Sequence, residues 1–316
     1  MSSELLINIT PSESRVALIE NGVLQEIQLE RQSHLGIVGN IYLGKVSRVL
    51  PGMQAAFVDI GLDKAAFLHA SDIVNSTIIL EGVAASNAKK TQDIRTLVRQ
   101  GQLIMVQVVK DPLGTKGARL TTDITIPSRY LVFMPDAKHV GVSQRIETDE
   151  ERLRLKNIVK QYNDDDGGFI IRTAAEGASE LELAHDANFL KKLWQKIKEK
   201  RKKLSKEGIL HEDLILAFRT LRDFVGEDME RIRVDSKLTY QQLKVFTEEF
   251  VPQLSTLLEY YPGERPIFDL FNVENEIQRA LQRKVELKSG GYLIFDQTEA
   301  MTTVDVNTGA FVGHRN

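Results

Sequence analysis

Short runs of β-branched and aliphatic residues dominate the first 125 positions and predict a region built from strands. Two runs, 4–9 and 15–30, open the chain, and Asn21-Gly22 interrupts the second. Asn-Gly is typical of a type I′ hairpin turn, because both central positions of that turn need positive φ. Glycines and prolines then separate five further runs, at 40–49, 53–60, 65–70, 103–110 and 118–125. This pattern is typical of a small closed barrel.

Helical spacing of apolar residues becomes frequent after residue 148, and shorter strand-like runs lie between the helices. The predicted helices are 148–161, 180–206, 211–224, 238–250 and 273–287. The predicted strands are 130–134, 169–173, 231–234, 292–296 and 301–306. Ser289-Gly290-Gly291 is interpreted as the end of the last helix, where glycines are common. The mixture predicts an α+β fold.

Composition narrows the function classes. With 316 residues, 42% hydrophobic and 27% charged, the chain is long enough for two or three domains. The net charge is −3, so a polyanion would need a local basic patch. The absence of cysteine excludes disulfides, thiolate nucleophiles and sulfur-ligated metals. We expect a cytoplasmic protein without a membrane partner, since neither a signal peptide nor an apolar run of about 20 residues is present.

Two phenylalanines, Phe57 and Phe67, lie ten residues apart on successive strands of the predicted barrel. Spacing alone favours a place in the core. Facing outward, they would form a surface on which bases stack, and nearby cations would hold phosphates. The same region supplies six such cations: Lys45, Arg48, Lys64, Lys110, Lys116 and Arg119. This combination favours binding of single-stranded nucleic acid.

A basic segment at 191–206 contains nine Lys or Arg and one Glu, a local charge of +8. Leu190, Trp194, Ile197 and Leu204 recur near helical spacing, which predicts an amphipathic helix with a basic outer face. Such a face is usually just solvated. Contact with an RNA backbone is the second interpretation.

Arg172 and Thr173 adjoin at the end of a predicted buried strand. A guanidinium group binds phosphate through two hydrogen bonds, and a hydroxyl can add another. An ordinary salt bridge at the strand end is the alternative.

The last predicted hairpin carries Asp296, Glu299, Asp305 and Asn307. Asp305 and Asn307 are two positions apart on a strand and should project from the same face. Their oxygens are hard ligands suited to Mg²⁺. A surface hairpin with solvated acids is an equal alternative.

Taken together, these motifs resemble the ribonuclease E/G endoribonuclease family. The resemblance covers nearly the whole chain. It rests on 40–46, 55–61, 66–68, 114–118, 171–174 and, above all, 290–307.

The resemblance implies a composite architecture. It divides the chain into an RNase H-like subdomain in two parts (1–38 and 213–280), an inserted S1-type OB barrel (39–125), a 5′-sensor subdomain (126–212) and the start of a DNase I-like catalytic subdomain (281–316).

The resemblance also implies roles for single residues in RNA recognition. Phe57, Phe67 and Lys116 would grip single-stranded RNA, Arg172 and Thr173 would hold a 5′-monophosphate, and Val132 would pack against the terminal base. Two positions depart from the family pattern. Ser128 replaces a glycine of the sensor pocket, and Gln144 replaces one of two arginines, beside Arg145.

For catalysis, the resemblance implies that Asp305 binds Mg²⁺ and that Asn307 helps to position the attacked phosphate. The family's second aspartate ligand and its Cys-Pro-x-Cys zinc link are absent from this sequence, so no zinc is expected. Family members form homo-oligomers and cleave A/U-rich RNA in rRNA precursors and mRNA. We expect this chain to bind RNA but scarcely to cut it. A non-catalytic RNA-binding module is the alternative.

Overall fold

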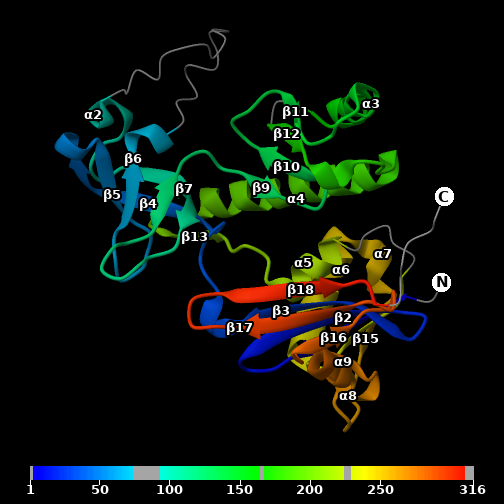
Figure 1. Ribbon diagram of the computed structural model, residues 1–316. Coiled ribbons are helices and arrows are strands. Elements are labelled where there is room, and N and C mark those ends of the chain that lie inside the picture. The colour runs from blue at the N-terminus through cyan, green and yellow to red at the C-terminus, as the bar shows by residue number, and fades with distance from the viewer. Residues whose placement is uncertain (1–2, 74–92, 164–166, 224–228, 310–316) are drawn as a thin grey trace. The chain divides into compact units, whose positions relative to one another are not determined.

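The computed structural model describes residues 3–73, 93–163, 167–223 and 229–309. Contacts divide the chain into two compact units (Figure 1). The first comprises 1–29, 228–244 and 257–316, and the second comprises 30–227 and 245–256.

The first unit is built on a five-stranded sheet of order β15-β14-β1-β2-β3. Its strands are β1 (Ser3–Ile9), β2 (Glu13–Glu20), β3 (Val23–Arg31), β14 (Met229–Val234) and β15 (Leu258–Tyr260). The predicted hairpin turn is confirmed, because Asn21 and Gly22 have φ of 49° and 78°. The chain's N-terminal strand β1 lies parallel to β14, so this sheet joins distant parts of the sequence.

Helices α6 (Lys237–Phe250), α8 (Ile267–Leu270) and α9 (Val273–Ala280) accompany this sheet in the sequence. Leu6 and Ile19 of the sheet pack with Phe268 and Val273 in one buried cluster. Apolar burial of this kind stabilises the unit against the conformational entropy of the unfolded chain.

A second sheet of the first unit corrects a sequence prediction. The helix predicted at 273–287 ends at Ala280, and Lys284–Glu286 forms strand β16. This segment pairs with β17 (Tyr292–Gln297), which also pairs with β18 (Thr302–Asn307). Gly290, at φ 85°, belongs to the turn between β16 and β17 and does not end a helix. The prediction was wrong because it ignored the backbone partners that β17 offers.

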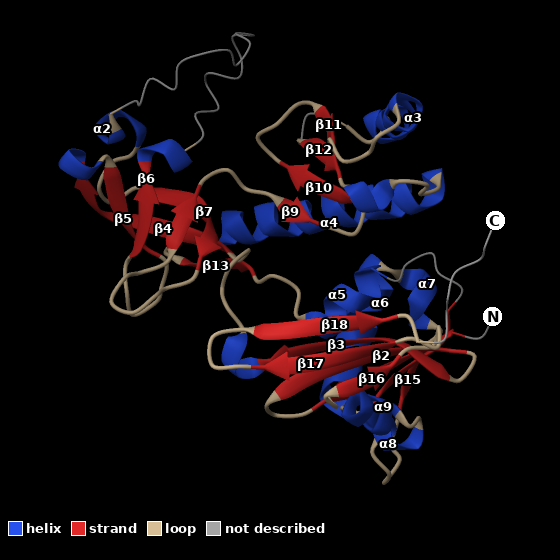
Figure 2. Ribbon diagram, viewed as in Figure 1, coloured by secondary structure: helices blue, strands red, loops and turns tan. Residues whose placement is uncertain are grey.

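The second unit contains the predicted barrel (Figure 2). Its strands are β4 (Ile41–Leu50), β5 (Ala55–Asp59), β6 (Ala66–His69), β7 (Leu103–Lys110) and β8 (Arg119–Thr121). Strand β4 pairs with both β5 and β7, which closes the sheet, so the prediction of a closed barrel is confirmed. Its interior includes Val46, Val58, Leu68, Val106 and Leu120. The segment 74–99, which the sequence predicts to be a loop plus a helix, lies in part outside the described residues, and the described part contains α2 (Ile94–Leu97).

Next to the barrel, the predicted helix 211–224 is shorter than expected. Helix α5 spans Leu216–Asp223. Residues Gly208–His211 form strand β13, which pairs with β4 and extends the barrel sheet. The helical prediction was wrong at its start because it could not include this long-range pairing.

A four-stranded sheet of order β11-β12-β10-β9 and two helices complete the second unit. The elements are β9 (Ile126–Pro127), β10 (Leu131–Met134), β11 (Val140–Val142), α3 (Asp149–Lys160), β12 (Gly168–Ile171) and α4 (Glu180–Lys203). Ser179 and Glu182 form a capping box at the start of α4. Helix α7 (Pro252–Ser255) also belongs to this unit.

An aromatic cluster fixes α4 against this sheet. The ring centroid of Phe133 lies 5.3 Å from that of Phe169 and 6.1 Å from that of Trp194. Phe133 is fully buried, so Phe133→Ala should lower the free energy of unfolding by about 3–5 kcal/mol. Thermal or denaturant unfolding measures this loss. Leu153→Ala, on the exposed side of α3, is the control, and an equal loss in both variants would contradict the assignment.

Candidate functional site

Phe57 and Phe67 lie directly opposite each other on the outer surface of the barrel. Their ring centroids are 6.3 Å apart and the rings meet edge to face at 69°. Both side chains are half-buried, whereas the residues that alternate with them are buried: Ala56, Val58, Ala66 and Leu68. The interpretation that both belong to the core is therefore wrong, and their rings remain accessible.

The register places basic residues on both sides of this aromatic pair. Arg48 lies opposite Phe57 on β4, and Arg119 lies beside Phe67 on β8. Lys110 of β7 is in turn opposite Arg119. We call Arg48, Phe57, Phe67, Arg119 and Lys110 the cross-strand row. It combines ring faces with positive charge, which suits a single-stranded polyanion with flat bases.

The turn that carries Lys116 packs against the segment that precedes β6 of the barrel. The Lys64 ammonium donates a 2.5 Å hydrogen bond to the Gly114 carbonyl. A Cβ on Gly117 would lie 2.0 Å from the Ala65 carbonyl oxygen, so only glycine permits this close approach. Lys116 is exposed and lies on this turn, just before Arg119.

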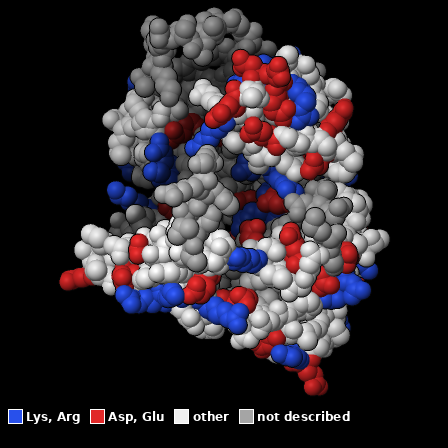
Figure 3. Space-filling model, turned by 45° about the vertical axis from the view of Figure 1, so that its right-hand side comes forward, with Lys and Arg blue, Asp and Glu red and all other residues white. Residues whose placement is uncertain are grey.

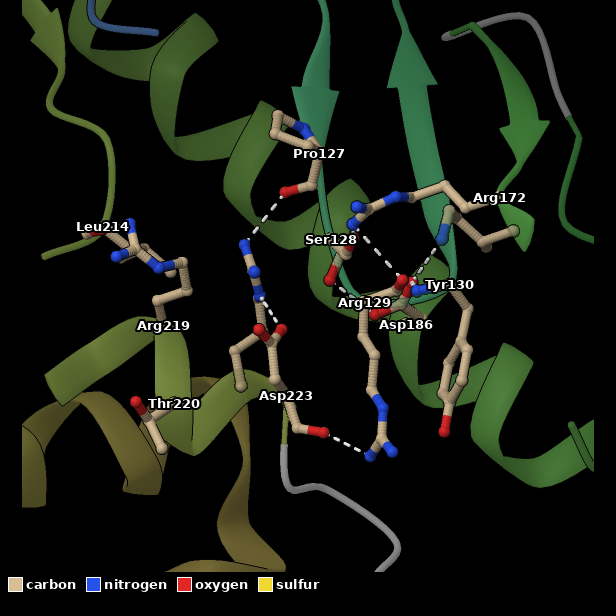
Figure 4. A network of polar contacts seen from close by, with 12 residues as sticks. Pro127, Ser128, Arg129, Tyr130, Arg172, Asp186, Leu214, Arg219, Thr220 and Asp223 are labelled. Carbon is tan, nitrogen blue, oxygen red and sulfur yellow. Dashed lines mark hydrogen bonds and ion pairs between the residues drawn. The ribbon is translucent and has the colours of Figure 1, made fainter. Parts of the chain in front are cut away.

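Arg172 lies at the end of β12 and crosses the segment that precedes β10 (Figure 4). Its guanidinium donates to the carbonyl of Ser128 and, at 3.3 Å, to that of Arg129. Its backbone N–H donates to the Tyr130 carbonyl at 2.8 Å. These contacts fix the guanidinium, and the expected salt bridge at the strand end is not formed among the described residues.

Thr173 faces a second hydroxyl. Its Oγ1 lies 3.0 Å from Oγ of Ser143, and the Arg145 N–H donates to the same Ser143 oxygen at 3.4 Å. Arg152 donates to the Ser143 carbonyl at 2.7 Å and to the Ile146 carbonyl at 3.2 Å. Arg152 therefore holds the turn that carries Ser143, and sequence reasoning missed both residues. Gln144, one of the family departures, lies in this turn.

Ser128, the other departure, uses its hydroxyl inside the protein. The side chain is fully buried and donates a 2.5 Å hydrogen bond to Oδ1 of Asp186. Asp186 also accepts from the N–H groups of Tyr130 and Leu131, at 3.0 and 2.8 Å. Burial raises the pKa of Asp186, and these hydrogen bonds oppose that rise. Asp186 thus fixes the segment whose carbonyls hold Arg172.

Val132 occupies β10 between its two neighbours. It lies opposite Ile170 of β12 and Pro127 of β9, and it is half-buried. Phe133, the next residue, points into the core. Val132 is therefore on the opposite face of the sheet from the aromatic cluster.

Asp305 and Asn307 share one face of β18, as predicted. The Asn307 amide donates a 2.9 Å hydrogen bond to Oδ2 of Asp305, which is exposed. Asp296 shares this face through its position opposite Thr303, but Arg283 binds it at 2.7 Å. That bond lowers the pKa of Asp296.

A carboxylate beside an amide fits the hard-ligand preference of Mg²⁺, which keeps several waters. Among the described residues, no three potential metal ligands come together. Glu299 lies in the exposed turn between β17 and β18. The structure thus offers one carboxylate, Asp305, next to one amide, and does not add Glu299 to them.

The basic segment lies on α4 and, beyond the helix end, on the residues that follow. Leu190, Trp194 and Ile197 are buried, which confirms the amphipathic prediction. Lys196 forms an ion pair with Glu249. On the face shown in Figure 3, basic and acidic side chains are interspersed.

Two family profiles match the chain. The profile of the S1 RNA binding domain covers 37–122, and that of the Ribonuclease E/G family covers 125–316. The described part of the chain has no helix long and apolar enough to cross a membrane.

Curated relatives match the chain from end to end. Ribonuclease G of Escherichia coli (strain K12) is 67% identical over 318 residues, and that of Haemophilus influenzae is 62% identical over 315 residues. Ribonuclease E of Nostoc is 36% identical over 310 residues, covering 96% of this chain and 43% of its own length. The alignments cover 100% and 99% of this chain but 64% of each ribonuclease G.

Proposed function

Because the chain belongs to the ribonuclease E/G family, we propose that it functions in the endoribonucleolytic cleavage of single-stranded, A/U-rich RNA. The observation that carries this proposal is the cross-strand row, in which two opposed aromatic rings lie between arginines. The expected substrates are rRNA precursors and mRNA in the cytoplasm, cut by a homo-oligomer.

In this proposal the barrel holds the body of the RNA. Bases stack on Phe57 and Phe67, while Arg48, Lys110 and Lys116 neutralise phosphates along the strand. Arg119 contributes less charge, because Asp72 pairs with it at 2.9 Å. Stacking does not read sequence strongly, so the A/U preference comes from the ease with which such RNA stays unpaired.

The 5′ end of the RNA is proposed to lie at Arg172 and Thr173. Carbonyl acceptors hold the guanidinium in place, and a 5′-monophosphate would add a charged acceptor to its remaining N–H groups. The Thr173 hydroxyl, beside that of Ser143, is a second donor. Val132 offers an apolar surface for the terminal base. The subdomain boundaries at 126–212 and elsewhere stay a prediction.

Magnesium is the proposed cofactor, and Asp305 would hold it with Asn307 close to the attacked phosphate. The ion would activate water and stabilise charge on the phosphorane. The Asn307 amide would position the phosphate beside the exposed carboxylate of Asp305.

The alternative function is an RNA-binding module without chemistry. It is favoured by the acids of the described hairpin, because Asp296 is held by Arg283 and one carboxylate alone fixes a metal poorly. We therefore expect the 316-residue chain to bind RNA tightly and to cut it scarcely.

Incubation of the chain with 5′-monophosphorylated A/U-rich RNA and Mg²⁺, beside Asp305→Asn, tests this expectation. Binding without Asp305-dependent products is the expected outcome, since Mg²⁺ needs a fixed geometry to act. Rapid cleavage that disappears in Asp305→Asn would show that Asp305 suffices and would contradict it. Asp296→Asn is the matched control on the same hairpin.

Charge reversal at Lys200, Arg201 and Lys202 should reduce the salt dependence of RNA binding without changing sequence preference. Lysines on an exposed helix face neutralise phosphates but do not read bases, and each phosphate contact contributes about −0.7 to the log–log salt slope for single strands. The measurement is RNA affinity at several salt concentrations. An unchanged slope would mean that this face is only solvated.

A further inference from the structure

The guanidinium of Arg172 has one nitrogen bound by the protein and one edge left open. Nη1 donates to the carbonyls of Ser128 and Arg129, whereas Nε and Nη2 have no partner among the described residues. The side chain is exposed. Nε and Nη2 lie along one side of the planar group, so together they can donate two parallel hydrogen bonds to one phosphate. The carbonyls that bind Nη1 therefore decide which edge of Arg172 is presented to a phosphate.

Those carbonyls belong to a segment, 127–131, whose backbone is held on both sides. Arg222 of α5 donates to the Pro127 carbonyl at 3.1 Å, and the backbone N–H of Arg172 donates to the Tyr130 carbonyl at 2.8 Å. With the two carbonyls that bind Nη1, the four consecutive carbonyls from 127 to 130 all accept hydrogen bonds from two arginines. A shift of this segment would therefore turn the guanidinium as well.

Asp186 of α4 binds the same segment through its remaining polar groups (Figure 4). One carboxylate oxygen accepts from the Ser128 hydroxyl at 2.5 Å, and the other accepts from the N–H groups of Tyr130 and Leu131. Ser128 is 0% exposed and Asp186 is 6% exposed, so water cannot replace these hydrogen bonds when one partner is removed. The carboxylate thus fixes the segment to α4.

We propose that Asp186 and Ser128 are positioning residues for recognition of the RNA 5′ end, because they fix the carbonyls that orient the open edge of Arg172. This inference rests on the proposed contact between Arg172 and a 5′-monophosphate. Both side chains are buried and do not touch RNA themselves. Their loss should therefore lower the preference for 5′-monophosphorylated RNA, while the cross-strand row still binds the body of the strand.

The ratio of the dissociation constants of matched 5′-hydroxyl and 5′-monophosphorylated RNAs tests this role. A loss of folded protein affects both constants equally and cancels in the ratio. Ser128→Ala should lower the ratio by about twofold to tenfold, because one hydrogen bond that fixes the segment is lost. Asp186→Ala should lower it by about tenfold or more, because all three are lost.

Two further variants separate positioning from general perturbation. Asp186→Asn should keep the ratio within about threefold of wild type, since the amide oxygen can accept from both N–H groups and the amide NH₂ can donate to the Ser128 oxygen. Thr220→Val removes another buried hydroxyl, which donates to the Leu216 carbonyl within α5, and should leave the ratio unchanged.

The outcomes distinguish this role from the proposed function. A wild-type ratio in folded Ser128→Ala and Asp186→Ala, beside a lowered ratio in Arg172→Gln, would overturn the positioning role alone. An unchanged ratio in Arg172→Gln would contradict the phosphate contact and the positioning role with it. A loss in Thr220→Val equal to that in Ser128→Ala would also overturn the role. Circular dichroism checks the fold, and Ser128→Ala decides if Asp186→Ala does not fold.

Discussion

Phe57→Ala should weaken binding of a short single-stranded RNA by roughly 5- to 150-fold, because stacking of one base on an aromatic ring contributes about 1–3 kcal/mol. The ring lies outside the barrel core, so its loss should cost little stability. Phe67 loses its edge-to-face partner in this variant, which adds to the effect on binding. Fluorescence anisotropy at one fixed salt concentration measures the change.

Two matched variants separate stacking from folding. Phe57→Leu keeps an apolar side chain without a ring face and should lose most of the same affinity. Met53→Ala removes an exposed apolar side chain nearby and should leave binding unchanged. Wild-type affinity in a folded Phe57→Ala protein would eliminate the stacking role.

Arg172→Gln should reduce the preference for 5′-monophosphorylated over 5′-hydroxyl RNA by about 10- to 150-fold. A hydrogen bond to a charged group contributes about 1.5–3 kcal/mol, and the terminal phosphate is the group that differs between the two RNAs. The ratio of the two dissociation constants is the quantity to measure, since general weakening cancels in it.

Lys160→Gln is the control for Arg172→Gln, because it removes an exposed charge from α3. It should weaken both RNAs equally. If Arg172→Gln also leaves the ratio at the wild-type value, then the guanidinium serves only to bind the carbonyls of Ser128 and Arg129.

Local signals in the sequence sufficed to predict the barrel and the first hairpin. Asn21-Gly22 specifies its turn by itself, and short strands between glycines and prolines predicted the closed sheet. The cross-strand row could not be predicted in this way. A register shift between Val46 and Arg48 decides that Arg48 lies opposite Phe57, and this shift arises from pairing between strands.

The wrong helix predictions have the same cause. His211 and residues 284–286 fall inside predicted helices, yet each belongs to a strand that pairs outside its own segment. Ser143 and Arg152 were missed because their role depends on a turn packed beside Thr173. By contrast, the two-residue spacing of Asp305 and Asn307 was enough to place them on one face.

Photo-crosslinking with mapping by mass spectrometry tests whether single-stranded RNA lies across the cross-strand row and has its 5′ end at Arg172. An RNA with photoreactive bases in its body and a distinct photoreactive group at its 5′ end should be used. Body adducts are expected in the peptides that carry Phe57 and Phe67, and 5′-end adducts are expected near 143 and 172–173. Adducts confined to the basic segment at 191–206 would contradict it.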